Sequence, residues 1–414
     1  MNIIIGAGVS GLSYAAFSNE EYLILEAGTE IGGYCKTTKR NGFTWDYAGH
    51  FFHFKEKEIK EFVFSRLKKQ KIHDVNKITK IKYKDSYIDF PFQKNIHQLS
   101  KEEYIECLVG LIERDEDKSC ISFKDMILQK FGEGICNKFL IPYNEKLYST
   151  DLNRLDKDAM GRFFPYADID EIILNAKNEG NSSYNSKFLY PEGGAIEFVN
   201  AINSEVDQSK ILFNKKVVSI SVSDKTVTTE DGSLYHYDKL INTAPITQLY
   251  NMCSIVYDSS IYSSNYVSVF NIGFDKKSEL DHHWVYFPDK ETNFYRIGYY
   301  NNILSEEKMR LYVELGHNQN FEDGNIDTLF KDVIRDLKLN NIITNQTVVD
   351  WQYIKMDPAY VHINANSESD KKKNLELLQD NQIFSIGRYG SWTYCSIEDN
   401  IIEARDLVRM HSDV

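Results

Sequence analysis

Several features are scarce or missing in this sequence of 414 residues. Its six cysteines are scattered and form no Cys-x-x-Cys pair, which argues against a disulfide framework and a zinc site. No apolar run approaches the roughly 18–20 residues of a membrane span, and the N-terminus lacks the basic segment of a signal peptide. Acidic residues outnumber basic ones, 61 to 48, so the chain should repel nucleic acid. We therefore expect a cytoplasmic protein with reduced thiols and no bound metal.

Arginine is also scarce, since the chain has 11 arginines against 37 lysines. Arginine is the residue suited to bidentate phosphate recognition, so each one carries more information here. Aromatic residues are abundant, with 27 Tyr and 24 Phe, and apolar residues make up 42 % of the chain. This composition predicts a soluble globular protein of two or three domains.

The sequence begins with a strand, a glycine-rich turn, a helix and a second strand. The first six residues form an apolar run that ends at Gly6, and the second apolar strand, Tyr22–Leu25, ends at Glu26. Gly6 suits a tight turn, Gly8 lets the backbone approach a pyrophosphate, and Gly11 lets the helix pack closely on the strand. The helix N-terminus supplies N–H donors to phosphate, and Glu26 can accept hydrogen bonds from a ribose. This arrangement predicts a dinucleotide-binding unit.

Further along the chain, helical spacing dominates from about residue 101 to 179, and a hairpin is predicted between residues 78 and 92. Residues 257–274 and 283–300 are rich in Tyr, Val and Ile, which favours an antiparallel sheet. Ile383–Gly387 is a late apolar strand that ends in glycine. The two glycine-ended strands therefore lie at opposite ends of the chain, which predicts a dinucleotide domain interrupted by insertions.

A second glycine pair, Gly32-Gly33, follows Glu26 directly after the second strand. This arrangement resembles the FAD-binding family that includes amine oxidases, protoporphyrinogen oxidase and UDP-galactopyranose mutase. The resemblance implies FAD as the cofactor, in the reduced form if the protein is a mutase.

Other segments resemble the mutases more closely. Residues 46–53 and 87–92 resemble segments beside the mutase flavin, and residues 143–148 resemble the Tyr-Thr-x-Lys-x-Trp motif whose first Tyr stacks on uracil. Arg162 lies at the spacing of the arginine on the mutases' mobile loop. Arg388 and Tyr394 keep the six-residue offset of a phosphate-binding Arg and Tyr.

The resemblance implies a set of site residues. Catalytic roles are expected for Arg162 and Arg388, which would bind the anionic leaving group, and for His50 at the flavin edge. Substrate binding is expected from Tyr143, Tyr148, Tyr184, Lys187, Arg296 and Tyr394. Cofactor binding is expected from Gly6, Gly8, Val9, Ser10, Gly11, Glu26, Ala27, Gly32, Gly33, Gly49, His50, Val217, Gly387, Arg388, Ser396 and Ile397.

Three positions depart from the mutase pattern. An arginine that grips the pyrophosphate is replaced by Val267, a phosphate-binding tyrosine by Phe294, and a loop arginine by Lys187. Hydrogen bonds to charged groups contribute about 1.5–3 kcal/mol each, so these changes weaken the expectation of a UDP-galactose substrate.

We expect an α/β protein with a Rossmann-type FAD-binding domain, a helical insertion and an antiparallel sheet that binds substrate. The expected FAD-binding segments are residues 1–75, 190–250 and 375–414. The helical insertion is expected at residues 76–189 and the antiparallel sheet at residues 251–374.

The resemblance implies a nucleotide-sugar mutase that interconverts pyranose and furanose forms through attack of reduced FAD N5 on the anomeric carbon, in cell-surface glycan biosynthesis. A reductant such as NAD(P)H and a homodimer are further expectations. The alternative is an amine-oxidase-like or protoporphyrinogen-oxidase-like oxidoreductase acting on a small organic substrate. A flavin-binding protein without turnover also stays open.

Overall fold

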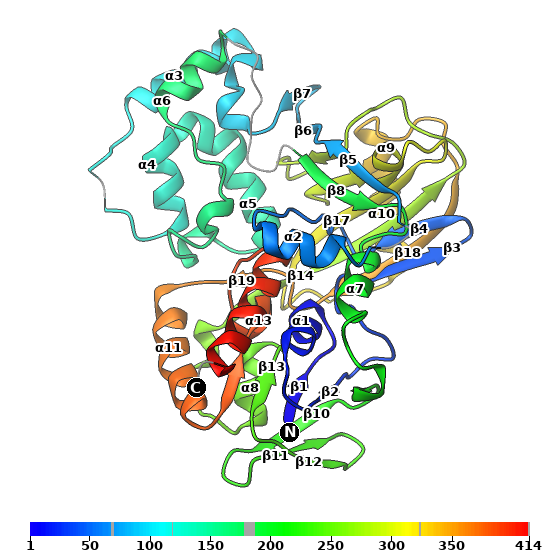
Figure 1. Cartoon of the computed structure of the whole chain (residues 1–414). Coiled ribbons are helices and arrows are strands. Elements are labelled where there is room, and N and C mark those ends of the chain that lie inside the picture. The colour runs from blue at the N-terminus through cyan, green and yellow to red at the C-terminus, as the bar shows by residue number, and fades with distance from the viewer. Residues whose placement is uncertain (68–69, 118, 178–186, 323, 413–414) are drawn as a thin grey trace.

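The computed structural model describes residues 1–67, 70–117, 119–177, 187–322 and 324–412. Its lower part in Figure 1 holds a parallel sheet with both chain ends, and its upper part holds an antiparallel sheet beside a group of helices. The predicted fold class is confirmed: a Rossmann-type α/β unit is combined with an antiparallel sheet and helices. No helix in the described segments has the length and apolar character needed to cross a bilayer.

The parallel sheet joins segments from both ends of the chain. Its strand order is β20-β13-β1-β2-β9, and all of its pairings are parallel. The strands are β1 (Asn2–Ile5), β2 (Tyr22–Leu25), β9 (Ile211–Leu212), β13 (Leu240–Asn242) and β20 (Ile383–Ser385). The late strand β20 thus reaches the same sheet as β1, as the two glycine-ended strands predicted.

Helices cover this sheet with apolar faces. Ile4 and Ile24 of the sheet pack in one core with Leu12, Phe198 and Ala404 from three different helices. These helices are α1 (Val9–Phe17), α7 (Ile196–Asn203) and α13 (Ile397–Ser412), and α2 (Lys57–Phe64) packs into the same core. Three further helices lie elsewhere around the sheet: α8 (Ile246–Met252), α11 (Ala365–Asp380) and the short α12 (Gly387–Gly390).

The large sheet has the strand order β18-β14-β17-β16-β15-β6-β7, and β19 also pairs with β14. Its strands are β6 (Thr79–Tyr83), β7 (Ser86–Asp89), β14 (Ser263–Phe274), β15 (Trp284–Tyr286), β16 (Arg296–Tyr299), β17 (Arg310–Asn318), β18 (Val348–Met356) and β19 (Val361–His362). Two helices within the same region are α9 (Tyr300–Leu304) and α10 (Ile326–Leu339). The predicted hairpin at residues 78–92 forms as β6–β7, but it joins this sheet through parallel pairing of β6 with β15.

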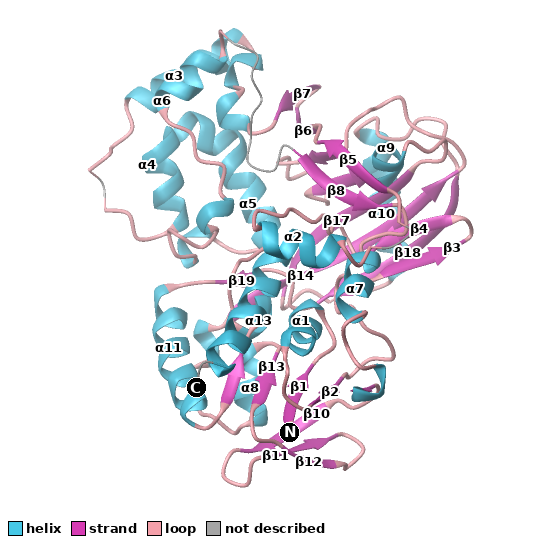
Figure 2. Cartoon of the chain, viewed as in Figure 1, coloured by secondary structure: helices cyan, strands magenta, loops and turns pink. Residues whose placement is uncertain are grey.

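The region expected to be a helical insertion is therefore helical only after the hairpin. Its helices are α3 (Lys101–Ile112), α4 (Phe123–Ile135), α5 (Ile141–Tyr148) and α6 (Ile169–Asn175). Figure 2 shows these helices gathered on one side of the large sheet. The backbone kinks at Gly132, whose φ of 68° is left-handed, and a Cβ there would meet the Gly110 carbonyl oxygen at 2.0 Å.

Smaller antiparallel ladders complete the fold. They are formed by β3 (Thr37–Arg40) with β4 (Phe43–Asp46), β5 (Ile72–Asn76) with β8 (Lys187–Pro191), and β10 (Val217–Ser221) with β11 (Thr226–Thr229) and β12 (Leu234–His236). A turn at Asp231-Gly232 joins β11 and β12, and Gly232 has a φ of 80° there.

Candidate functional site

A cavity of about 600 Å³ starts at the carboxyl end of the parallel sheet and continues to the large sheet. Its lining includes Glu26 at one end and Arg296 with Glu314 at the other. Ligands of open α/β sheets bind in this position, beyond the carboxyl ends of the strands. The cavity therefore has the place and the elongated lining expected of a site for a dinucleotide with a substrate beside it.

The glycines of the first turn have the geometry that their predicted tasks require. Gly6 has a φ of 97°, and a Cβ at Gly11 would lie 2.0 Å from the Gly6 carbonyl oxygen. By contrast, a Cβ at Gly8 would meet nothing nearer than Gly33 Cα, at 3.9 Å. Gly8 and Gly33 both line the cavity. The two glycines therefore leave open space next to the first turn of α1, where backbone N–H groups and the helix dipole favour phosphate.

Glu26, directly after β2, stabilises this turn through hydrogen bonds. One carboxylate oxygen accepts a hydrogen bond from the Ala7 N–H at 2.7 Å, and the other accepts one from the Gly28 N–H at 2.7 Å. Its side chain also lines the cavity. A carboxylate has about four acceptor positions, so Glu26 can hold the loop and still accept from a ribose.

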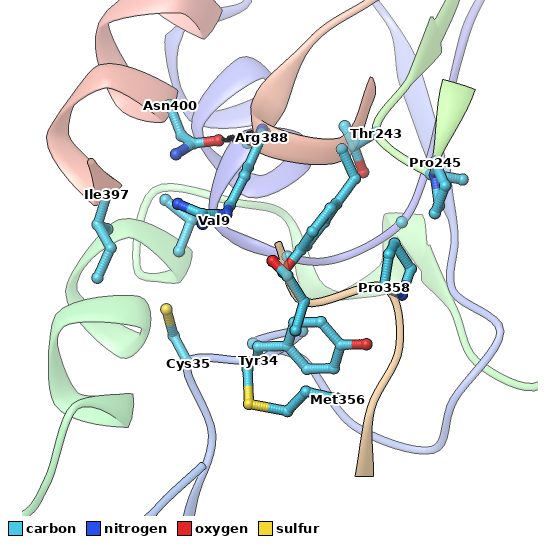
Figure 3. A pocket seen from close by; sticks show the side chains of 18 of the residues that line it. Val9, Tyr34, Cys35, Thr243, Pro245, Met356, Pro358, Arg388, Ile397 and Asn400 are labelled. Carbon is cyan, nitrogen blue, oxygen red and sulfur yellow. Dashed lines mark hydrogen bonds between the residues drawn. The ribbon is translucent and has the colours of Figure 1, made fainter. Parts of the chain in front are cut away.

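Residues close to the last strand form the next part of the cavity wall (Figure 3). The backbone N–H of Arg388 donates to the Asn400 side chain at 2.8 Å, and its guanidinium donates to the Cys395 carbonyl at 3.0 Å. That guanidinium lies over the rings of Tyr394 and Tyr360, at 4.7 and 5.4 Å from their centroids. Among the described residues, no carboxylate forms an ion pair with Arg388. The cavity wall thus carries a positive charge that the described protein does not neutralise.

Arg296 is different, because its charge is already paired. Its Nε and one terminal nitrogen donate to the two oxygens of Glu314, at 2.6 and 2.8 Å. Glu314 is buried on β17, opposite Arg296 on β16. This bidentate pair leaves Arg296 less available to an anionic ligand than Arg388.

His50 lines the cavity between these two arginines and is neutral at physiological pH. Burial lowers its pKa to about 4, and the charges of Arg388 and Arg296 act in the same direction. Its Nδ1 is buried and has no hydrogen-bond partner among the described residues. A neutral imidazole with a free ring nitrogen can exchange one hydrogen bond with a ligand.

The cavity brings together most of the expected cofactor residues. They are Gly6, Gly8, Val9, Ser10, Glu26, Ala27, Gly32, Gly33, Gly49, His50, Val217, Arg388, Ser396 and Ile397. Gly11 and Gly387 lie outside its lining and serve close packing instead. A Cβ at Gly387 would lie 2.4 Å from Ser10 Oγ.

The expected substrate residues are spread more widely. Tyr394 and Arg296 line the cavity, but Tyr143, Tyr148 and Lys187 do not. Tyr143 is 9 % exposed and packs between rings, stacked on Phe139 at a centroid distance of 5.1 Å. Tyr184 falls outside the described residues. The roles given to these side chains stay predictions.

Arg162 lies near the cavity without lining it. Its guanidinium forms an ion pair with Asp399, at the start of α13, and lies over the ring of Phe163, 4.7 Å from the centroid. Phe163 itself lines the cavity and meets Tyr394 edge-on at 5.3 Å. The segment that carries Arg162 therefore covers one edge of the cavity, and its role in binding an anion stays a prediction.

Several lining residues were not singled out from the sequence. Glu314 and Tyr360 belong to no recognised motif. The resembling motif aligns a tyrosine with Phe294, so it does not point to the neighbouring Tyr295. Phe294 is fully buried in a separate core, where it meets Phe287 edge-on at 4.8 Å. An irregular entry into β16 places Tyr295 and Arg296 on the same side, which strict strand alternation does not predict. Val267, noted as the replacement of an arginine, does line the cavity.

Two half-buried lysines lie near this region. Lys77 has its ammonium 5.2 Å from the Trp284 ring centroid, and burial together with the Arg296 charge lowers its pKa to about 8. The Lys146 ammonium donates to four backbone carbonyls between residues 287 and 294, at 2.7–2.9 Å. Lys146 thereby fixes the segment that leads into Tyr295. Within the described segments, no group of three His, Cys, Asp or Glu side chains is arranged to hold a metal.

Comparisons with known proteins agree with this geometry. Residues 4–65 match the family model of the NAD(P)-binding Rossmann-like domain. Reduced UDP-galactopyranose mutase superposes with a TM-score of 0.92 at 23 % identity, over 100 % of this chain and 93 % of that one.

Two other solved structures share the architecture at lower similarity. An Exiguobacterium protein named as a protoporphyrinogen oxidase gives a TM-score of 0.79 at 14 % identity, over 99 % of this chain and 98 % of that one. The CLA-producing fatty acid isomerase from P. acnes gives 0.68 at 13 % identity, with coverages of 99 % and 98 %. The chain therefore has the fold of UDP-galactopyranose mutase, with a dinucleotide-binding Rossmann-like unit in its first 65 residues.

Proposed function

We propose that this chain is an FAD-dependent enzyme. The support for a dinucleotide is the open space between Gly8 and Gly33 at the start of α1, with Glu26 at the end of β2. The support for FAD over a nicotinamide cofactor is the second glycine pair after Glu26 and the fold shared with a reduced mutase. Gly6, Gly8, Gly33 and Glu26 would hold the adenosine and pyrophosphate parts.

The reaction we propose is the interconversion of pyranose and furanose forms of a nucleotide sugar, in cell-surface glycan biosynthesis. Bound FAD, once reduced by a donor such as NAD(P)H, supplies the nucleophile for the anomeric carbon, so the protein needs no nucleophilic Ser, Cys or Asp. What the protein must supply is positive charge for the departing nucleoside diphosphate.

The observation that carries this proposal is the half-buried guanidinium of Arg388. It lines the cavity, and no described carboxylate neutralises it. Removing a charge from water is costly unless it is paired, so a half-buried guanidinium without a carboxylate partner favours an anionic ligand. Arg388 would bind the diphosphate and stabilise the charge that develops on it as the glycosidic bond breaks. The rings of Tyr394 and Tyr360, which are half-buried, lie beside the guanidinium and help to orient it.

Net redox chemistry is the second candidate, and two specific observations favour it. Val267 gives the cavity wall an apolar side chain, and Glu314 neutralises Arg296. Tyr295, Tyr360 and Tyr394 add aromatic wall, which suits a small organic substrate. This candidate does not use the unpaired charge of Arg388, so we place it second.

Incubation with a panel of nucleotide sugars distinguishes the two candidates. Dithionite-reduced holoenzyme should convert one nucleotide sugar into an isomer of equal mass that separates on anion exchange, while oxidised holoenzyme should not. Turnover that consumes oxygen or another electron acceptor, with no isomer from any sugar in the panel, would contradict the mutase proposal and support the oxidoreductase.

A further inference from the structure

Lys77, in the link between β5 and β6, is a half-buried cation held by two aromatic rings. Its ammonium lies 5.2 Å from the ring centroid of Trp284 and 5.5 Å from that of Phe90. No carboxylate among the described residues forms an ion pair with it. Aromatic rings attract a cation but carry no net charge of opposite sign. The positive charge of Lys77 is therefore not neutralised by its direct neighbours.

This charge acts on residues of the cavity lining. Trp284 stacks on Phe51 with the ring centroids 5.1 Å apart, and Phe51 lines the cavity. His53 also lines the cavity, and the charge of Lys77 adds to burial in lowering the pKa of His53 to about 4. The charge of Arg296, another lining residue, adds to burial in lowering the pKa of Lys77 to about 8. Lys77 itself does not line the cavity, so it would act on a ligand there through its charge and without direct contact.

The lining residues near Lys77 do not compensate its charge. His50 and His53 are neutral at pH 7, because burial lowers the pKa of each to about 4. Arg296 forms a bidentate ion pair with Glu314, so this pair adds no net charge. Charges interact over longer distances in partly buried surroundings than in water, because the effective dielectric constant is lower. Lys77 should therefore make the electrostatic potential more positive at the Arg296 end of the cavity.

This end of the cavity is where the redox-active ring of FAD would lie. In the proposed function Gly6, Gly8, Gly33 and Glu26 hold the adenosine and pyrophosphate parts, and the cavity continues from there to Arg296. Two-electron reduction at neutral pH adds negative charge to the flavin ring, and protein charges nearby change the energy of this reduction. A fixed positive charge stabilises the more negative, reduced form.

We propose that the ammonium of Lys77 raises the midpoint potential of bound FAD and thereby favours its reduced form. This inference rests on the proposed function, because the mutase reaction uses reduced FAD. Lys77 acts through its charge alone, without giving up electrons or forming a covalent bond. The electrons come from the donor, such as NAD(P)H.

Lys80 offers a matched control on the adjoining strand β6. It is half-buried like Lys77, but its ammonium forms an ion pair with Asp89 at 2.5 Å. Lys77→Met and Lys80→Met each remove one positive charge from the chain, and only the first removes an unpaired charge that acts on the cavity lining. Lys77→Met should fold, because methionine is unbranched and its sulfur packs well against aromatic rings. Lys77→Arg keeps the charge in place.

The test is a reductive titration of the holoenzymes at pH 7 against a reference dye, with FAD content and thermal unfolding recorded in parallel. Lys77→Met should shift the reduction equilibrium about tenfold toward oxidised FAD, which is about 30 mV for a two-electron couple. Lys77→Arg should keep the potential close to that of the wild type, and Lys80→Met should leave it unchanged. If Lys77→Met does not retain FAD, Lys77→Gln replaces it with the same expected shift.

The possible failures can be told apart. A wild-type potential in Lys77→Met, an equal shift in Lys80→Met, or an equal shift in Lys77→Arg would overturn the inference and leave the proposed function standing. If the potential shifts as expected but reduced holoenzyme isomerises no nucleotide sugar, the effect of Lys77 on FAD stands and the proposed mutase reaction falls. If the wild-type chain binds no FAD, both are overturned.

Discussion

Gly8 allows a sharp test of the cofactor site, because the structure separates its role in folding from its role in binding. Its backbone has φ −80° and ψ −175°, a conformation open to any residue, and an added Cβ would meet only Gly33 Cα at 3.9 Å. Gly8→Ala should therefore leave the flavin-free protein as stable as the wild type, or stabilise it by about 0.4–1 kcal/mol through the unfolded chain. The new methyl group would instead occupy the space next to the helix start.

The expected loss of affinity follows from the hydrogen bonds at stake. If the methyl group displaces the pyrophosphate from one N–H donor, about 1.5–3 kcal/mol is lost, or about 10- to 100-fold in Kd for FAD. Gly11→Ala is the contrasting variant, since its Cβ would lie 2.0 Å from the Gly6 carbonyl oxygen. It should destabilise the flavin-free protein by at least about 1–3 kcal/mol, the usual effect of overpacking.

Flavin titration and chemical unfolding of the flavin-free proteins measure both quantities. Retention of wild-type FAD affinity by Gly8→Ala would refute the proposed position of the pyrophosphate. A loss of stability in Gly8→Ala equal to that in Gly11→Ala would refute the claim that the space beside Gly8 is open.

The remaining predictions concern the anion site, the aromatic core and acid stability. Arg388→Ala should lower kcat/KM by about 10²–10³, and Arg388→Lys should restore only part of it because an ammonium lacks the planar fork, as steady-state kinetics would show. Tyr143→Ala should cost about 3–5 kcal/mol in denaturant unfolding because it leaves a cavity, whereas Tyr143→Phe should change stability by less than about 1 kcal/mol. Stability should fall as the pH drops from about 6.5 to 4, because burial lowers the pKa of four histidines to about 4, and the unfolded chain then binds protons that the folded chain does not. These histidines are His50, His53, His283 and His362. Burial raises the pKa of Asp46 to about 6, so this carboxyl stabilises the fold on acidification and offsets the effect of about one of the four histidines. A midpoint of urea unfolding that rises as the pH falls from about 6.5 to 4 would contradict this prediction.

The parallel sheet and its cofactor turn were predictable because their signals are local. The spacing of Gly6, Gly8 and Gly11 indicates positions where the backbone turns tightly or leaves no room for a side chain. The positive φ of Gly6 and the close approach at Gly11 agree with this, and Gly8 leaves open space for a ligand. Strands β1 and β2 also lie where the apolar runs placed them. The late strand β20 could be assigned to the same sheet because it too is short, apolar and ended by glycine.

The substrate side was less predictable because its geometry depends on contacts between distant segments. The hairpin β6–β7 was expected, but its parallel pairing with β15 depends on strands about 200 residues apart. Glu314 carries no motif, and its pairing with Arg296 follows only from the register of β16 with β17. A charge that looked free in the sequence is thus neutralised in the fold.

The exchange of roles at Phe294 and Tyr295 illustrates the same limit. Counting along the strand assigns a missing hydroxyl to Phe294, since its place in the resembling motif belongs to a tyrosine. The structure turns Phe294 toward Phe287 and places Tyr295 in the cavity lining. The Lys146 ammonium holds the segment before β16 in this arrangement through four carbonyls. Lys146 belongs to the motif that suggested a nucleobase platform, yet its contacts are with this backbone. The motif therefore acts on the cavity at a distance, by fixing which of two neighbouring aromatic residues faces it.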